Sequence, residues 1–129
     1  MAGPELQAWE RKLRDALHAV DRMLEERYGD RYPLRPNRPP AGKTTSFAAD
    51  GLFSVGAKYT AGFGSASGEG YIVEIRMSTL ANVPADLRET VRNDAADLLR
   101  EKLESIFPDR DLDGSREGTV LKIHGDLDL

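Results

Sequence analysis

The chain has 129 residues, of which 40% are hydrophobic and 31% are charged. These values are typical of one globular domain, and they exclude a chain that is disordered throughout, a collagen-like chain and a repeat array. The formal net charge of -4 gives no strong attraction to nucleic acid or to anionic lipid. The chain contains no cysteine, which excludes disulfides, thiolate metal sites and a cysteine nucleophile.

The first residues, MAGPELQAWERK, contain an early proline and glutamate and no apolar stretch, so they do not have the pattern of a secretory signal. No segment approaches the roughly 18 apolar residues that a membrane-spanning helix needs. We therefore expect a cytoplasmic protein that does not enter the membrane.

Residues 4–28 have the periodicity of an amphipathic helix. Pro4 suits a first helical turn, and Gly29 is of the type most often found just past a helix end. Charged residues, Asp21 and Glu25 among them, occupy the side away from the apolar stripe. The stripe consists of Leu6, Trp9, Leu13, Leu17, Val20, Leu24 and Tyr28.

The next segment, residues 31–46, contains four prolines, which block both a helix and a central strand. It is therefore predicted to be an extended connector. It is also locally basic, with no acidic residue between its positive charges. Because proline-rich arms lose little entropy on binding, these charges are candidate contacts to a partner protein, with a plain connector as the alternative. The basic residues are Arg31, Arg35, Arg38 and Lys43.

Apolar and polar residues alternate over 52–60 and again over 71–79, which predicts two strands. The glycine-rich sequence between them is too short for a crossover helix, so residues 52–79 are predicted to form an antiparallel hairpin. The glycine spacing departs from the dinucleotide fingerprint, and a strand follows where that fingerprint needs a helix. Phe63, at the loop tip, is a further candidate contact to a partner.

A second amphipathic stripe predicts a helix over 84–107, with Asn82 as its N-cap and Pro84 in its first turn. An acidic turn over 109–118 is expected to lead to a last strand over 119–124. In that strand, Lys122 and His124 are predicted to point away from the core. The stripe of the helix consists of Leu87, Val91, Ala95, Leu98, Leu99, Leu103 and Ile106.

The order helix, strand, strand, helix, strand predicts an α+β fold in a single domain over residues 1–129. We expect a two-layer sandwich in which two long amphipathic helices cover one face of a three-stranded, mainly antiparallel sheet. Such a sheet has open edges, and one of them is predicted to pair with a second copy of the chain. The expected assembly is a homo-oligomer, a dimer in the first instance.

The sequence DRDLDG matches the first half of an EF-hand calcium loop, in which three carboxylates curl around one cation. Asp109, Asp111 and Asp113 supply the carboxylates, and Glu117 occupies the ninth position. Val120 stands where the bidentate glutamate belongs. The pattern indicates calcium or another hard cation, with an ordinary solvated acidic turn as the alternative. No other cofactor is predicted.

Catalytic patterns are weak. The two histidines, His18 and His124, are isolated in the sequence, and neither Ser65 nor Ser78 has the spacing of a nucleophile elbow. Glu74 is followed two residues later by Arg76 on the polar face of the predicted hairpin, where the two can form an ion pair. We find no residue set that indicates an enzyme.

The element order is similar to that of the second type of KH domain, a nucleic-acid-binding family. That resemblance implies RNA binding through a G-x-x-G turn between helices. Here the glycines lie between strands, and the second helix exposes acidic residues that repel phosphate. We therefore expect a non-enzymatic interaction or oligomerisation module, with calcium binding as the first alternative and KH-like nucleic-acid binding as the second. The acidic residues are Glu89, Asp94, Asp97, Glu101 and Glu104.

Overall fold

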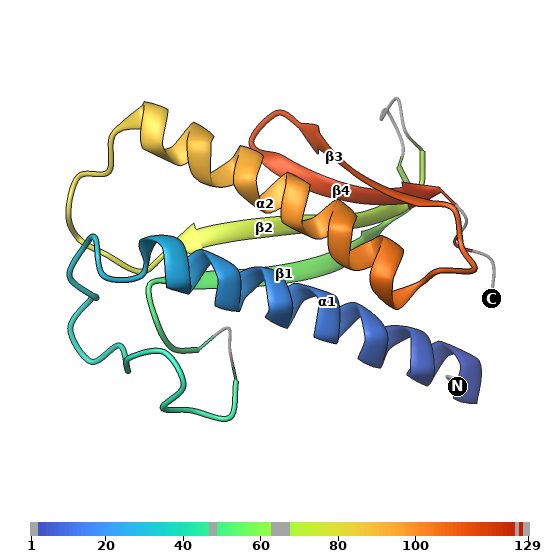
Figure 1. Cartoon of the computed structure of the whole chain (residues 1–129), viewed down its shortest axis with the longest axis horizontal. Coiled ribbons are helices and arrows are strands. Elements are labelled where there is room, and N and C mark those ends of the chain that lie inside the picture. The colour runs from blue at the N-terminus through green and yellow to red at the C-terminus, as the bar shows by residue number, and fades with distance from the viewer. Residues whose placement is uncertain (1–2, 47–48, 63–67, 126, 128–129) are drawn as a thin grey trace.

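A computed structural model of the chain describes residues 3–46, 49–62, 68–125 and 127. The described residues form two helices and a four-stranded sheet (Figure 1). In chain order the elements are α1 (Pro4–Tyr28), β1 (Phe53–Thr60), β2 (Gly70–Met77), α2 (Ala85–Ile106), β3 (Leu112–Glu117) and β4 (Val120–Gly125).

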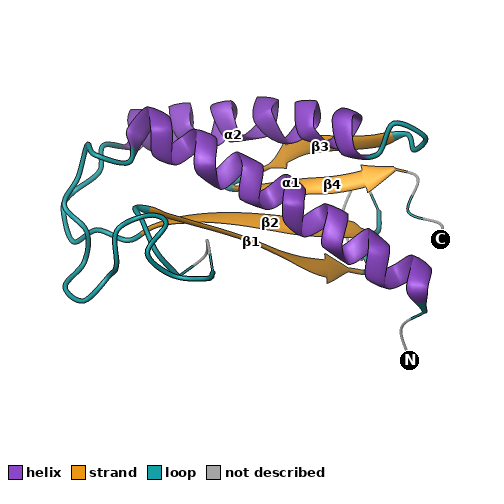
Figure 2. Cartoon of the chain, turned by 60° about the horizontal axis from the view of Figure 1, so that its bottom comes forward, coloured by secondary structure: helices purple, strands orange, loops and turns teal. Residues whose placement is uncertain are grey.

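The strands lie in the order β1-β2-β4-β3, and each neighbouring pair is antiparallel. Figure 2 shows both helices on the same face of this sheet. α1 packs on β1, α2 packs on β3 and β4, and the helices contact each other. The described residues thus form two layers, with the core between them and one sheet face turned away from the helices.

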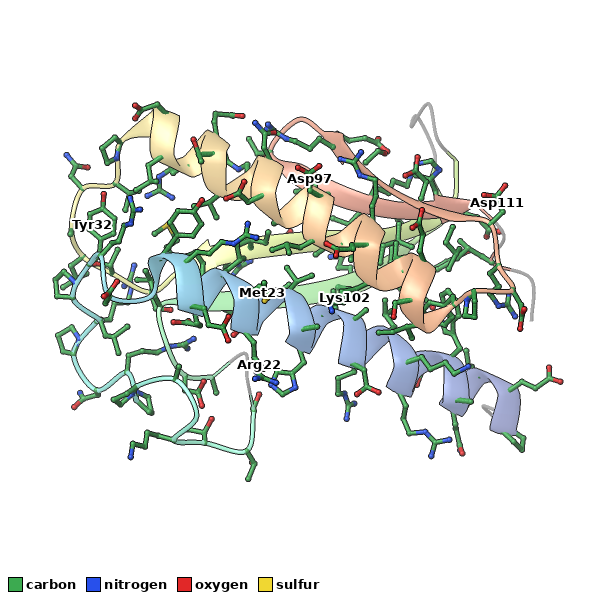
Figure 3. The ribbon with its side chains drawn as sticks, in the orientation of Figure 1. Arg22, Met23, Tyr32, Asp97, Lys102 and Asp111 are labelled. Atoms are coloured by element: carbon green, nitrogen blue, oxygen red, sulfur yellow. The ribbon has the colours of Figure 1, made fainter. Side chains whose placement is uncertain are left out.

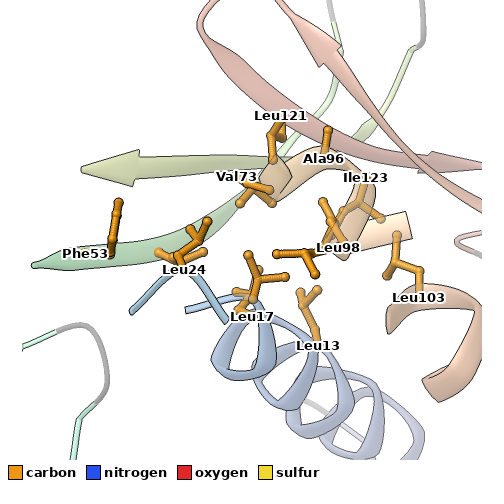
Figure 4. Close-up of a cluster of buried hydrophobic side chains, with 14 of the residues drawn as sticks. Leu13, Leu17, Leu24, Phe53, Val73, Ala96, Leu98, Leu103, Leu121 and Ile123 are labelled. Carbon is orange, nitrogen blue, oxygen red and sulfur yellow. The ribbon is translucent and has the colours of Figure 1, made fainter. Parts of the chain in front are cut away.

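The core lies where the two helical stripes meet the sheet. Val73 stands opposite Ala57 on one side and Leu121 on the other, so successive strands contribute a row of apolar side chains. Leucines from both helices close over this row (Figure 4). Each fully buried side chain of this size contributes about 1.5–3 kcal/mol, so the stripes and the row together hold the two layers.

The sheet has one strand more than the sequence predicts. Residues 109–118 are predicted to be an acidic turn, but Leu112–Glu117 forms β3. The segment LDGSRE has little intrinsic preference for a strand. It becomes one because β4 pairs with it along its whole length, with Gly118 (φ 64°) in the turn between them. The order of elements is therefore helix, strand, strand, helix, strand, strand. It differs by one strand from the order on which the resemblance to the KH domain rests.

The helices follow their apolar stripes closely. α1 occupies the range that its stripe predicts. α2 begins at Ala85, with Pro84 rather than Asn82 at the N-cap position and no side-chain cap. Among the described residues, neither helix is apolar enough to cross a membrane.

Candidate functional site

A cleft of about 650 Å³ lies between the outer flank of α1 and the connector that leads to β1. Polar residues of α1 between Arg14 and Glu26 line one wall, and Asp50 with residues 41, 42, 44 and 45 of the connector lines the other. In Figure 3, Arg22 extends from α1 on the side of the connector. The volume falls within the range of sites that bind small molecules.

Arg38 holds the connector against the start of β1. Its Nε donates to Gly51 O at 3.0 Å, and its Nη2 donates to Asp50 O at 3.0 Å and to Phe53 O at 3.3 Å. A backbone hydrogen bond from Gly51 N to Pro39 O, at 2.8 Å, closes the same loop. One guanidinium group therefore satisfies three carbonyls and fixes one wall of the cleft.

The cleft is lined by a buried carboxyl group, that of Asp21, whose side chain belongs to a residue only 3% exposed. Its Oδ2 has no hydrogen-bond partner among the described residues. Burial, followed by the charges of Glu25 and Asp50, raises the pKa of Asp21 from 3.8 to about 7, although Arg38 acts to lower it. Asp21 therefore gains or loses its proton near neutral pH, which is unusual for an aspartate.

Glu25 ties α1 to the start of β1. Its Oε1 accepts a hydrogen bond from Phe53 N at 2.8 Å. A side chain at Gly29 or at Gly51 would collide with Glu25, so both glycines allow the carboxyl group to lie close to the backbone. Burial raises the pKa of Glu25, although the backbone hydrogen bonds from Phe53 and Leu52 act to lower it.

Asp50 is fixed from the connector side. Its Oδ2 accepts hydrogen bonds from Thr44 N at 3.0 Å and from Thr44 Oγ1 at 2.9 Å. Burial acts to raise the pKa of Asp50, but the hydrogen bonds from Thr44 and the charge of Arg38 outweigh it and hold the pKa below its ordinary value. Asp50 therefore carries a negative charge where Asp21 senses it.

The helical period does not reveal this cluster, because it places Asp21 and Glu25 on the charged side of the first helix. Their neighbours hold the signal that could have found them. Asp21 follows Val20 and Glu25 follows Leu24, so both acids lie at the border of the apolar stripe. The helical period predicts which face of the helix is apolar, but it does not predict which flank of that face the connector covers.

The predicted metal ligands do not converge on one point. Asp113 and Glu117 lie in β3, and Asp109 and Asp111 precede it. A strand is extended, whereas a calcium loop curls its carboxylates around one ion. In the part of the chain that the structure describes, no group of three or more His, Asp or Glu side chains is placed to hold a metal ion.

The basic residues of the connector differ in their surroundings. Arg38 is the anchor described above, and the Arg31 guanidinium lies 5.1 Å from the centre of a tyrosine ring of α1. Arg35 and Lys43 are exposed. Phe63 lies outside the described residues. The connector is thus held to the fold by one of its cations while others face solvent.

The sheet face turned away from the helices carries polar pairs. His124 Nε2 lies 3.0 Å from Ser115 Oγ. The neighbour of this histidine is therefore Ser115, and not Ser65 or Ser78, the two serines considered from the sequence. Ser65 lies outside the described residues. Glu74 and Arg76 form an exposed ion pair at 2.9 Å on the same face, as their spacing allows.

Lys122 points away from the core, as predicted, but it is buried on this face. Only 2% of its surface is accessible. Its ammonium group donates to Gly68 O and lies 3.7 Å from the Glu117 carboxylate. The alternation of the strand gave the correct face, but the end of the β1–β2 hairpin reaches the lysine, which no local pattern predicts.

β1 forms one border of the sheet. Leu52 O accepts a hydrogen bond from Ser78 N at 2.7 Å, and the antiparallel ladder with β2 alternates from there. The backbone groups of Phe53 therefore point away from β2, and they bond instead to Glu25 and Arg38. The residues that repeat this orientation along β1 are Val55, Ala57 and Tyr59.

These three outward-facing residues leave an open strand edge in the part of the chain that the structure describes. Within residues 3–46, 49–62, 68–125 and 127, they make no backbone hydrogen bond outside the sheet. Figure 2 shows β1 as the outermost strand on its side. Tyr59 is 55% exposed and donates from its hydroxyl to Glu69 Oε2 at 2.6 Å.

Two comparisons place the chain among known proteins. A family model described as "Uncharacterised protein" matches residues 4–125. A protein from Borreliella burgdorferi, described as "Uncharacterized protein", is 39% identical over 106 residues, which cover 82% of this chain and 83% of that protein. No solved structure matches at a significant level. Neither description names an activity, a cofactor or a partner, and the chain belongs to this uncharacterised family, whose model spans both helices and all four strands.

Proposed function

We propose that the chain is an interaction module that forms a homodimer by pairing β1 with β1 of a second copy. The observation that supports this proposal is the outward-facing backbone of Val55, Ala57 and Tyr59. Exposed strand edges of this kind are templates for a further strand. Pairing two copies would join their sheets into one.

The residues along β1 suit pairing with themselves. In an antiparallel arrangement about a twofold axis at Ala57, Val55 of one copy faces Tyr59 of the other. Lys58 then lies opposite Gly56 of the second copy and not opposite another lysine, so like charges do not meet. The exposed ring of Tyr59 gains an apolar neighbour from the second copy.

The opposite edge of the sheet is less suited to pairing. β3 has six residues, among them Asp113, Arg116 and Glu117. Arg116 is held by Glu89 of α2 and by the carbonyl of Gly118. Short, charged edge strands resist the addition of another strand. This contrast favours β1 as the edge that pairs.

The test is the mass in solution, measured by light scattering from about 1 to about 100 μM, a range in which weak dimers dissociate. We expect a mass near twice the 14.2 kDa of one chain at the upper end. The variant Ala57→Pro should give the mass of a single chain. The Ala57 N–H points away from β2, so proline there removes no hydrogen bond within the sheet.

Lys58→Ala is the matched control, because its side chain lies on the sheet face and its backbone groups pair with β2. It should remain dimeric. A second measurement does not depend on a variant: amide exchange at Val55, Ala57 and Tyr59 of the unaltered chain should be slower at high protein concentration. A single-chain mass throughout, or unchanged exchange at those amides, contradicts the proposal.

A further inference from the structure

The cleft between α1 and the connector contains a polar atom with an unmet hydrogen-bonding need. Asp21 lines the cleft, is only 3% exposed, and leaves Oδ2 without a partner among the described residues. A buried polar atom in this state costs about 1–3 kcal/mol. A buried polar group of this kind is often completed by an ordered water or an ion, and here Asp21 lines a cleft large enough to hold a ligand.

The charges around Asp21 indicate what that ligand carries. Glu25 and Asp50 are the acidic groups that act on it, and Arg38 is the opposing cation. Both acids are already held, Glu25 by Phe53 N and Asp50 by Thr44. The net field at Asp21 is therefore negative, and a positively charged donor is the group that this field attracts.

An organic cation fits better than a metal ion. Glu25 and Asp50 each commit an oxygen to a backbone N–H. Throughout the described ranges, no three His, Asp or Glu side chains are arranged to coordinate a metal. An ammonium group needs no such coordination shell, since one hydrogen bond to Oδ2 within a negative field suffices to hold it.

The α1 wall of the cleft adds a row of opposite charge. Arg14, His18 and Arg22 follow one another at intervals of one helical turn, and all three line the cleft. Asp15 and Glu26 line it as well, so the wall is mixed but contains a row of two arginines with a histidine between them. An acidic group on the ligand would bind along that row.

We propose that this cleft binds a small molecule with an ammonium group at one end and a carboxylate at the other, with the ammonium group on Asp21 and the carboxylate along the row of Arg14, His18 and Arg22.

Binding of the ammonium group should release a proton from Asp21. The pKa of Asp21 is about 7 without ligand, so about half of the molecules carry that proton at neutral pH. Burial and the charges of Glu25, Asp50 and Arg38 set this pKa, and Arg14, His18 and Arg22 line the same cleft. Because only the ionised form pairs with a cation, affinity should rise about tenfold between pH 6 and pH 8.

Three simple probes separate the two ends of the ligand: 4-aminobutyrate carries both charges, n-butylamine only the ammonium group, and butyrate only the carboxylate. Amide NMR signals of Asp21, Thr44 and Asp50 report on the cleft. We expect 4-aminobutyrate at up to about 50 mM to shift these signals in a saturable manner. Butylamine should bind more weakly, and butyrate should leave the signals in place.

Asp21→Asn should weaken binding of 4-aminobutyrate at least about tenfold and remove its dependence on pH, since asparagine carries no charge. Asp111→Asn is the control, because it removes the same charge from an exposed site at the far end of the fold. It should bind as the unaltered chain does.

Two results would overturn the proposal: no shift of the cleft amides by either amine at about 50 mM, or equal binding by Asp21→Asn and the unaltered chain. Equal affinity for butylamine and 4-aminobutyrate would contradict the placement of the carboxylate along Arg14, His18 and Arg22. A thermal unfolding curve for Asp21→Asn with a single transition shows that its loss of binding is not loss of the fold.

Discussion

The molecule has two acidic regions. The acids of one are close together in the sequence, and the acids of the other are close together in space. Residues 109–117 hold four acids close together in sequence, but β3 spreads them along the surface. Asp21, Glu25 and Asp50 are separated by up to 29 positions, but they act on one another across a cleft. Figure 3 shows Asp111 at one end of the molecule and Arg22, on the cleft wall, near the middle of the view.

Neighbouring acids affect each other's pKa most strongly where the fold excludes water. Carboxylates exposed along a strand are screened by solvent and need not influence one another. Asp21 is buried, and its pKa rises from 3.8 to about 7 because burial and two neighbouring acids act on it together. The density of acids in the sequence is therefore a poor guide to a site, whereas burial of one of them is a good one.

The largest effect that we predict is on the wall of the cleft. Arg38→Ala leaves the carbonyls of Asp50, Gly51 and Phe53 without their donor. The loss of these hydrogen bonds should lower the free energy of unfolding by about 3 kcal/mol in total. For a domain of this size, that lowers the melting temperature by roughly 10 °C. Thermal unfolding followed by circular dichroism measures it.

Arg35→Ala is the matched control in the same connector. The Arg35 side chain is exposed, and its bond to Ser78 O comes from the backbone, which alanine retains. Its melting temperature should stay within about 2 °C of the unaltered chain. Equal losses in the two variants would mean that Arg38 does not anchor the connector.

The next effect concerns the pH dependence of stability. The pKa of Asp21 is raised on folding from 3.8 to about 7, so the folded chain holds a proton that the unfolded chain releases. The contribution of this proton to the free energy of unfolding is at its full value below about pH 3.8 and is lost as pH rises through 7. Between pH 5 and pH 8 the loss should reach about 2–3 kcal/mol, measured by urea unfolding at each pH.

Asp21→Asn removes this titration, so its stability relative to the unaltered chain should rise with pH by the same amount. Asp111→Asn tests the other acidic region and should leave the pH profile of the unaltered chain in place. If both variants change the profile alike, the contrast between the buried acid and the strand acids is wrong.

The helices and the hairpin could be predicted from the sequence because their signals are local. The stripe from Leu6 to Tyr28 requires only a helical period, and the alternation around Val55 and Val73 requires only a strand period. β3 could not be predicted in this way. Its residues prefer turns and solvent, and they form a strand because β4 is available to pair with them.

The candidate sites depend more on tertiary structure than the helices do, for a related reason. The calcium pattern depends on residues 109–114 forming a compact loop, which a strand does not allow. Arg38 was identified as a contact residue, but its charge is directed at the backbone of its own chain. The cleft joins α1 to a connector more than ten residues away, and no spacing in the sequence indicates that contact.

A smaller effect tests β3 itself. Gly114, the glycine of the DRDLDG pattern, is buried in the strand, where a Cβ would lie 3.1 Å from Leu99 Cδ2. Gly114→Ala should therefore lower the free energy of unfolding by about 1 kcal/mol through crowding. Gly114→Val should cost more. In a flexible surface turn, neither substitution would show this dependence on size, so urea unfolding of the pair distinguishes strand from turn.

The smallest expected effect is that of calcium. A ligand at about 100 times its dissociation constant would stabilise the fold by about 2.7 kcal/mol, but β3 offers no curled loop to bind it. Unfolding curves of EDTA-treated protein with and without calcium should coincide. A rise that is lost in Asp111→Asn would mean that residues 109–117 leave β4 to surround the ion. The sheet would then have three strands, and β4 would become an edge that competes with β1 for a second copy.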